Sequence, residues 1–231
     1  KWVKEYGIDG VFMQRFFRVT RDKDPNKDSN IILGHALEAA KKYERAIAVM
    51  YDLSGLSPEG EDCSSVIEDW KSLVDDLKVT SRGEDQTYLF HNGKPLVVIW
   101  GLGFPDRSYD IRNIRVDSLI NFLKNDPEYG GCSVMLGVPT YFRSLERDTK
   151  PDPYLHELIR SADIVLPWMV GRFRTKQSGG DNQYLDHVTQ DMAWCKENGV
   201  DYVPLVFPGF SWANMQLTNP RSTRKVEYAA I

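Results

Sequence analysis

The sequence has few cysteines, and the three that it has lie far apart. Cys63, Cys132 and Cys195 form neither a CxxC nor a CxxH pair. Disulfide-stabilised folds and zinc sites need closely spaced or evenly matched cysteines, often together with histidines. The cysteine pattern therefore argues against both a disulfide framework and a zinc site.

Long apolar runs and a strong excess of one charge are also absent. No segment approaches the roughly 18–20 apolar residues of a membrane-spanning helix. The formal net charge is -4, with 29 basic and 33 acidic residues spread along the chain. That balance does not give the basic surface that binds nucleic acid or an anionic membrane. We therefore expect neither nucleic acid as a partner nor a membrane span.

What the sequence does contain is a regular alternation of two patterns. Short apolar runs occur at Val11–Phe16, Ala46–Leu53, Leu96–Trp100, Cys132–Val138, Ile164–Trp168 and Tyr202–Phe207. Continuous runs of this length indicate strands that are buried on both faces, as in a parallel sheet. Helical patterns separate them, at residues 31–45, 65–77, 116–124, 153–161 and 181–198. This alternation predicts successive βαβ units.

Two features favour a (β/α)₈ barrel over an open, doubly wound sheet. No glycine-rich phosphate loop follows any strand, and residues with unusual chemistry follow several strands, which is where a barrel forms its site. The opening segment Lys1–Tyr6 has the pattern of a helix that follows an earlier strand. We therefore predict one α/β domain over residues 1–231, a (β/α)₈ TIM barrel with about six of its eight units and incomplete at both ends.

The ends of the predicted strands and the segments just after them carry aromatic, amide and charged side chains. The candidates are Gln14, Arg15, Tyr51, Asp52, Trp100, Tyr141, Trp168, Arg172 and Trp212. Sugar rings stack on aromatic faces, and sugar hydroxyl groups bond to carboxylates, guanidinium groups and amides. The set therefore predicts a cleft for a neutral oligosaccharide or polysaccharide. We expect Asp52→Ala and Trp100→Ala to weaken saccharide binding and to leave the fold largely intact.

The same residues also allow ordinary structural interpretations. Gln14 and Arg15 can form a buried polar pair, and Asp52 can cap the turn that follows its strand. The two tryptophans can pack in the core, and Arg172 can pair with a carboxylate. Residues 17–30, 54–64, 104–115 and 171–180 are expected as long loops, a type that often carries function; the last is either a lid or an inert excursion.

Four segments resemble, in the same order, proteins of glycoside hydrolase families 99 and 71. They are Glu5–Phe16, Val49–Leu56, Lys94–Pro105 and Val203–Met215. The first family contains endo-α-mannosidases and the second α-1,3-glucanases, and related bacterial proteins are labelled xylosidase or arabinosidase. No single segment is a specific signature, so the ordered set carries the resemblance.

The resemblance implies a barrel with a sugar cleft, no metal or other cofactor, and retaining hydrolysis of an α-linked, mannan-like glycan by two carboxylates. It also implies a secreted, periplasmic or cell-surface protein, although no signal peptide is present. Asp52 matches an acidic substrate-binding residue. The catalytic glutamate pair has no match, so the catalytic residues are unknown and are expected after Ile231.

Two other functions remain open. One is a different specificity within the same barrel, such as a xylosidase or an arabinosidase. The other is a carbohydrate-binding barrel without catalytic activity. A strand after Ile231 with two closely spaced carboxylates would favour an enzyme, and its absence would favour a binding protein.

Overall fold

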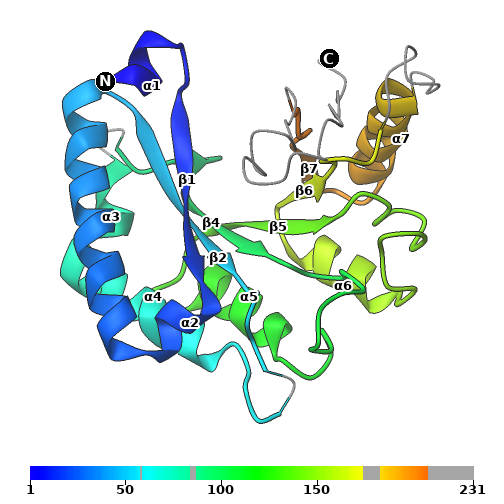
Figure 1. Ribbon diagram of the computed structural model, residues 1–231, viewed down its shortest axis with the longest axis horizontal. Coiled ribbons are helices and arrows are strands. Elements are labelled where there is room, and N and C mark those ends of the chain that lie inside the picture. The colour runs from blue at the N-terminus through cyan, green and yellow to red at the C-terminus, as the bar shows by residue number, and fades with distance from the viewer. Residues whose placement is uncertain (58, 84–86, 174–182, 208–231) are drawn as a thin grey trace, which may run out of the picture.

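The computed structural model describes residues 1–57, 59–83, 87–173 and 183–207, which form a curved sheet with helices along its outer side (Figure 1). The strands are β1 Gly10–Phe16, β2 Ala46–Asp52, β3 Phe90–His91, β4 Lys94–Trp100, β5 Ser133–Pro139, β6 Ile164–Trp168 and β7 Asp201–Tyr202. The helices are α1 Trp2–Glu5, α2 Phe17–Arg21, α3 Lys23–Tyr43, α4 Ser64–Leu77, α5 Val116–Asn125, α6 Tyr154–Ser161 and α7 Gln183–Glu197, with a 3-10 helix over Val79–Gly83.

The strands follow one another in space as they do in sequence. The order is β1-β2-β4-β5-β6-β7, all neighbours are parallel, and the short β3 pairs with β4 as an antiparallel hairpin. A doubly wound sheet reverses its order at a switch point, whereas a barrel does not. The predicted barrel-type α/β arrangement is therefore confirmed. Within the described ranges, the sheet runs from β1 to β7 without these two strands pairing with each other.

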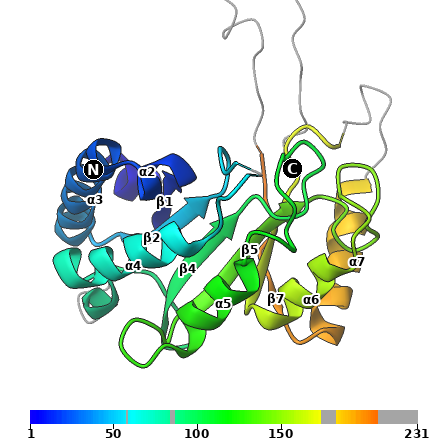
Figure 2. The ribbon, with the colours of Figure 1, turned by 90° about the horizontal axis from the view of Figure 1, so that it is seen from below.

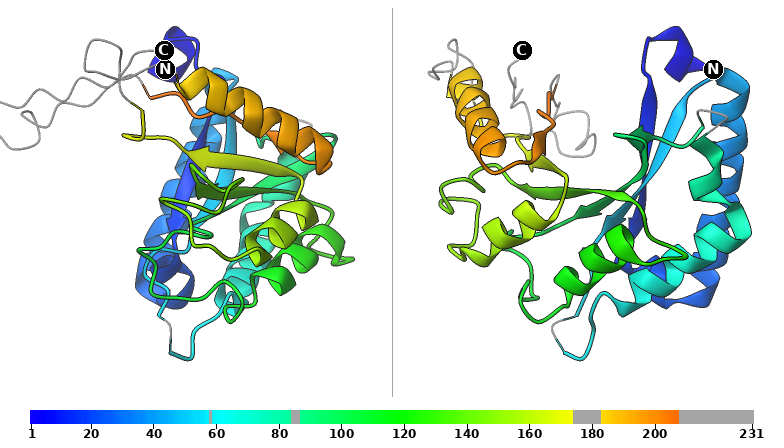
Figure 3. Two further views of the ribbon diagram at one scale, coloured as in Figure 1. Left: turned by 90° about the vertical axis from the view of Figure 1, so that its right-hand side faces the viewer. Right: turned by 180° about the vertical axis from the view of Figure 1, so that it is seen from behind.

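Alternate side chains of the strands enter two separate cores. The larger core lies between the sheet and its helices and includes Val97 and Ile99 of β4 and Trp70 of α4. The smaller core lies on the concave face and includes Val98 and Trp100. Figure 2 and Figure 3 show from three further directions that α3 to α7 follow the outer side of the sheet. The concave face is therefore the inside of the barrel.

Most predicted elements match the observed ones within one or two residues, but two differ. Residues 17–30 were expected as a loop and instead form α2 and the start of α3. Pro25 lies in the first turn of α3, where a backbone N–H needs no partner within the helix, so it does not break the helix. Strand β7 has two residues, Asp201–Tyr202, and is shorter than the predicted run.

The three cysteines are buried and have free thiols. Burial raises the pKa of each thiol to about 12, which makes the metal-binding thiolate scarce. Among the described residues, no group of three or more His, Cys, Asp or Glu side chains is arranged to hold a metal ion. No helix in these same ranges is long and apolar enough to cross a membrane.

Candidate functional site

A cavity of about 510 Å³ opens on the concave face, around the carboxyl ends of the parallel strands. Its size lies within the range of small-molecule sites, and the position is where barrels form their active sites. The lining combines apolar, aromatic, amide and charged side chains: Phe12, Gln14, Met50, Asp52, Trp100, Phe104, Asp106, Arg107, Leu166, Trp168, Arg172 and Leu205. Five of the nine residues predicted for the site therefore meet here.

Gln14 and Asp52 form the polar centre of this cavity. Parallel pairing sets Gln14 opposite Met50, so Gln14 and Asp52 lie on the same face of neighbouring strands. The Gln14 amide donates from Nε2 to Asp52 Oδ2 over 2.5 Å, and the backbone N–H of Ser54 donates to Oδ1 over 2.8 Å. Asp52 therefore caps the following turn and also lines the cavity. An ionised carboxylate has about four acceptor positions, so positions remain for the hydroxyl groups of a ligand.

Three aromatic rings form the apolar wall of the cavity. Trp100, which is 9% exposed, lies 5.9 Å from the Phe104 ring and 5.3 Å from the Trp168 ring, the latter edge-on. Trp100 packs over Gly137, where an added Cβ would lie 1.9 Å from Trp100 Cε3. Trp168 is 37% exposed. Trp100 is thus a packed core residue at the cavity wall, while Trp168 offers a free ring surface.

Charged groups of both signs complete the rim. Arg172 donates from Nε to Asp148 over 2.7 Å, so it is both paired with a carboxylate and part of the lining. Asp106 and Arg107 were not predicted as site residues, although both lie in the long segment after β4 that was expected to carry function. The Arg107 guanidinium lies over the Phe104 ring at 5.5 Å. The buried Nε of Arg107 has no hydrogen-bond partner within the described ranges.

Arg15 and Tyr51 do not line the cavity, and this corrects the sequence-based expectation. Successive side chains of a strand point to opposite faces, so these neighbours of Gln14 and Asp52 face the helices. Arg15 is 3% exposed and donates from Nε and Nη2 to Asp69 of α4, over 3.0 and 2.6 Å. The Tyr51 hydroxyl donates to the same carboxylate over 2.8 Å. The polar pair behind the sheet is thus Arg15 and Asp69, not Arg15 and Gln14.

Two other predicted residues lie elsewhere. Tyr141 lines a second cavity, of about 410 Å³, between the segment after β5 and helix α7. Trp212 lies outside the described residues, as do residues 174–180 of the predicted lid.

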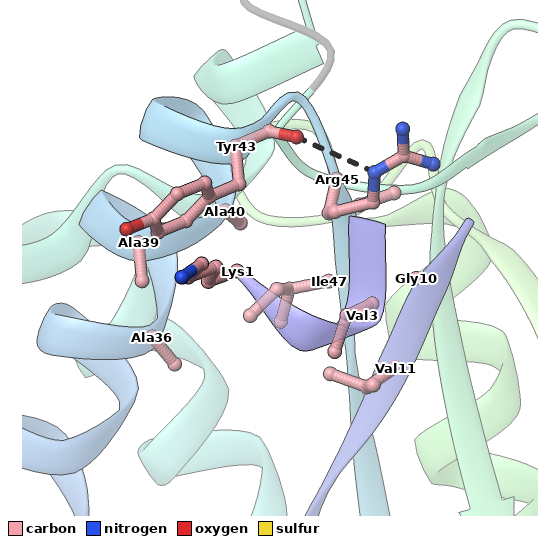
Figure 4. Close-up of a pocket in the computed structure, with 11 residues that line it drawn as sticks. Lys1, Val3, Gly10, Val11, Ala36, Ala39, Ala40, Tyr43, Arg45 and Ile47 are labelled. Carbon is pink, nitrogen blue, oxygen red and sulfur yellow. Dashed lines mark hydrogen bonds between the residues drawn. The ribbon is translucent and has the colours of Figure 1, made fainter. Parts of the chain in front are cut away.

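A third pocket lies at the opposite end of the strands and has a different character. It measures about 180 Å³ and lies where β1 and β2 begin, beside α3. Figure 4 shows Ala36, Ala39 and Ala40 of α3 facing Ile47 and Val11 across it. Because it is apolar and lies at the amino ends of the strands, it does not fit the position of a barrel active site.

Comparisons with known proteins now bear on this geometry. No model of a known protein family matches the sequence, and no curated protein matches it. A solved structure of a family 99 endo-α-mannosidase from Bacteroides thetaiotaomicron, in complex with bis-tris propane, matches with a TM-score of 0.51 over 94% of this chain. The fold is a partial (β/α)₈ barrel. The sequence identity is 16%, so this likeness shows the fold alone, and the chain spans 57% of the length of that solved protein.

Proposed function

We propose that this chain is part of a glycoside hydrolase that acts on an α-linked, mannan-like glycan, and that the 510 Å³ cavity holds sugar units of that glycan. The observation that carries the proposal is the placement of the Gln14–Asp52 pair and the exposed Trp168 ring in one cavity at the carboxyl ends of the strands. Sugar binding needs this combination of hydrogen-bonding groups and an aromatic face. The barrel fold shared with an endo-α-mannosidase supports the same proposal.

The charges around the cavity favour a neutral ligand. Asp52 and Asp106 are balanced by Arg107 and Arg172 among the lining residues. The Nε of Arg107 is a buried donor that has no partner among the described residues, and buried donors without a partner carry a free-energy cost. A hydroxyl oxygen of a sugar would accept from it and remove that cost. A polyhydroxylated, uncharged ligand therefore fits the lining better than a phosphate or a carboxylate does.

Asp52 takes the role of a binding residue in this proposal. Its two oxygens accept hydrogen bonds from the Gln14 amide and the Ser54 backbone N–H, which hold the carboxylate in one orientation towards a ligand. Retaining hydrolysis needs one carboxylate as acid and base and a second that assists attack on the anomeric carbon. We assign that catalytic pair to none of the described residues. A secreted, periplasmic or cell-surface location belongs to the same proposal.

A carbohydrate-binding barrel without catalytic activity is the second candidate. The hydrogen bonds that Asp52 accepts from Gln14 and Ser54 favour this second candidate, because they fix the carboxylate in position to hold a ligand. A panel of α-mannan, α-glucan and arabinoxylan oligosaccharides distinguishes the candidates when the full-length protein is used. Release of reducing ends indicates an enzyme and reveals its sugar, whereas binding without release indicates a binding protein.

We expect Asp52→Ala to weaken binding of the preferred oligosaccharide about tenfold or more, because hydrogen bonds to a charged group contribute about 1.5–3 kcal/mol. Isothermal titration calorimetry measures the affinity, and thermal unfolding shows whether the variant is folded. Asp76→Ala is the matched control, since Asp76 is exposed on α4, away from the cavity. Wild-type affinity in a folded Asp52→Ala protein would contradict the assignment of this cavity.

A further inference from the structure

The second cavity, of about 410 Å³, has a mainly polar lining. It also contains an aromatic platform, which consists of the Tyr141 ring and the Arg147 side chain that packs on it. The Arg147 guanidinium lies over the Tyr141 ring at 4.5 Å and donates from Nη1 to the Tyr141 hydroxyl over 2.5 Å. The same ring meets His187 edge-on at 5.0 Å. Contacts with the arginine and the histidine hold the Tyr141 ring in one orientation, and sugar rings pack against aromatic side chains that are fixed in this way.

The backbone beneath this platform is strained. Leu145 and Arg147 adopt φ values of 56° and 52°, in the left-handed region that residues other than glycine rarely occupy. Such residues persist where the surroundings fix them, and they concentrate at ligand-binding segments. Both residues lie in the segment after β5, which also supplies Tyr141 and Arg147 to the second cavity.

The polar wall of the second cavity is fixed by a buried carboxylate behind it. Asp191 is fully buried and accepts from Arg143 Nε over 3.1 Å, while Arg143 Nη2 donates to the Gln190 side-chain oxygen over 2.7 Å. His187 Nε2 donates to the Thr140 carbonyl over 2.9 Å. Arg143, Gln190 and His187 are therefore held in place before any ligand arrives, which lowers the entropy cost of binding.

Two residues, Asp148 and Thr140, each form hydrogen bonds to lining residues of both cavities. Asp148 accepts from Arg172 in the first cavity, and it accepts from the backbone N–H of Tyr141, over 3.1 Å, in the second. Thr140 forms another link, because its hydroxyl donates to the Trp168 carbonyl while its own carbonyl accepts from His187. Asp148 and Thr140 thus bond to lining residues of both cavities, which places the two cavities next to each other.

We propose that the second cavity is a further saccharide subsite, which binds a later unit of the same chain whose other units occupy the first cavity. The charges of Arg143 and Arg147 are balanced by Glu146 and Asp186 around it, so the unit is neutral. The site sets a preference for longer oligosaccharides. This inference rests on the proposed function, since it needs a saccharide in the first cavity.

The test uses the full-length protein and α-linked manno-oligosaccharides from disaccharide to hexasaccharide, with affinity measured by calorimetry. Wild-type affinity should rise with chain length until both cavities are filled. Tyr141→Ala should lower hexasaccharide affinity about tenfold, as expected for the loss of one stacking surface, and leave disaccharide affinity unchanged. Gln190→Ala, which leaves the platform intact, should reduce the same length increment. Trp168→Ala should instead weaken all lengths.

Several results would overturn the inference. If Tyr141→Ala and Gln190→Ala keep the full length dependence, the second cavity binds no sugar and the proposed function stands without it. If Tyr141→Ala weakens disaccharide and hexasaccharide equally, its effect passes through Asp148 to the first cavity, and the subsite is again excluded. If wild-type protein binds none of the series or of the wider panel, the proposed function and the subsite both fail.

Discussion

Replacing Asp69 with alanine should lower the free energy of unfolding by about 3–5 kcal/mol, the usual cost of breaking a buried ion pair by removing one partner. Asp69 is buried and accepts from Arg15 Nε and Nη2, from the Tyr51 hydroxyl over 2.8 Å and from Asn26 Nδ2 over 2.6 Å. Arg15 Nη1 already lacks a partner in the described part of the chain. Loss of Asp69 would leave a buried positive charge without compensation.

The effect should reach the cavity as well, because Arg15 and Tyr51 pair across β1 and β2 in the same register that sets Gln14 opposite Met50 and so places Gln14 and Asp52 on one face. Chemical denaturation of Asp69→Ala measures the stability loss. Asp76→Ala is the control on the same helix, and as an exposed substitution it should change stability by about 0.5 kcal/mol or less. Equal stability of the two variants would show that the network behind the sheet contributes little.

Trp100→Ala should lower stability by about 3–5 kcal/mol, as large-to-small changes at buried tryptophans do. The Trp100 ring covers Gly137, contacts the Phe104 and Trp168 rings, and belongs to the core on the concave face. This replaces the expectation from the sequence that Trp100→Ala leaves the fold largely intact. Thermal or denaturant unfolding measures the loss.

Trp168→Ala provides the contrast at the same wall. Trp168 is 37% exposed, so its removal should cost about 1 kcal/mol, close to the contribution of one aromatic pair. The saccharide affinity of the Trp168→Ala variant should fall while the variant stays folded. A Trp100→Ala variant as stable as Trp168→Ala would contradict the packing role assigned to Trp100.

The order and type of the strands could be predicted because their apolar runs are continuous and separated by helical patterns. The same continuity hid the orientation of the side chains. A strand buried on both faces shows no alternation of apolar and polar residues, so the sequence does not tell which face a given residue joins. Gln14 and Asp52 do line the first cavity, whereas their neighbours Arg15 and Tyr51 face the helices on the other side of the sheet.

Side-chain partners that come from distant segments could not be predicted from the sequence either. Asp69 lies in the middle of an amphipathic helix and carries no local signal that it bonds Arg15, which is 54 residues away. Arg107 lies in a long segment, and the length of that segment was the only sign that it carries function. The start of α3 was missed because residues 17–30 were taken as one long loop after the first strand, whereas α3 already begins at Lys23.

The most direct test of the central claim is a crystal structure of the full-length protein with its preferred oligosaccharide. The account predicts a sugar ring against Trp168, with ring hydroxyl groups bonded to Asp52 and Gln14 and one hydroxyl oxygen on Arg107 Nε. Electron density for the sugar at the amino ends of the strands, or on the outer helices, with the first cavity empty, would contradict it.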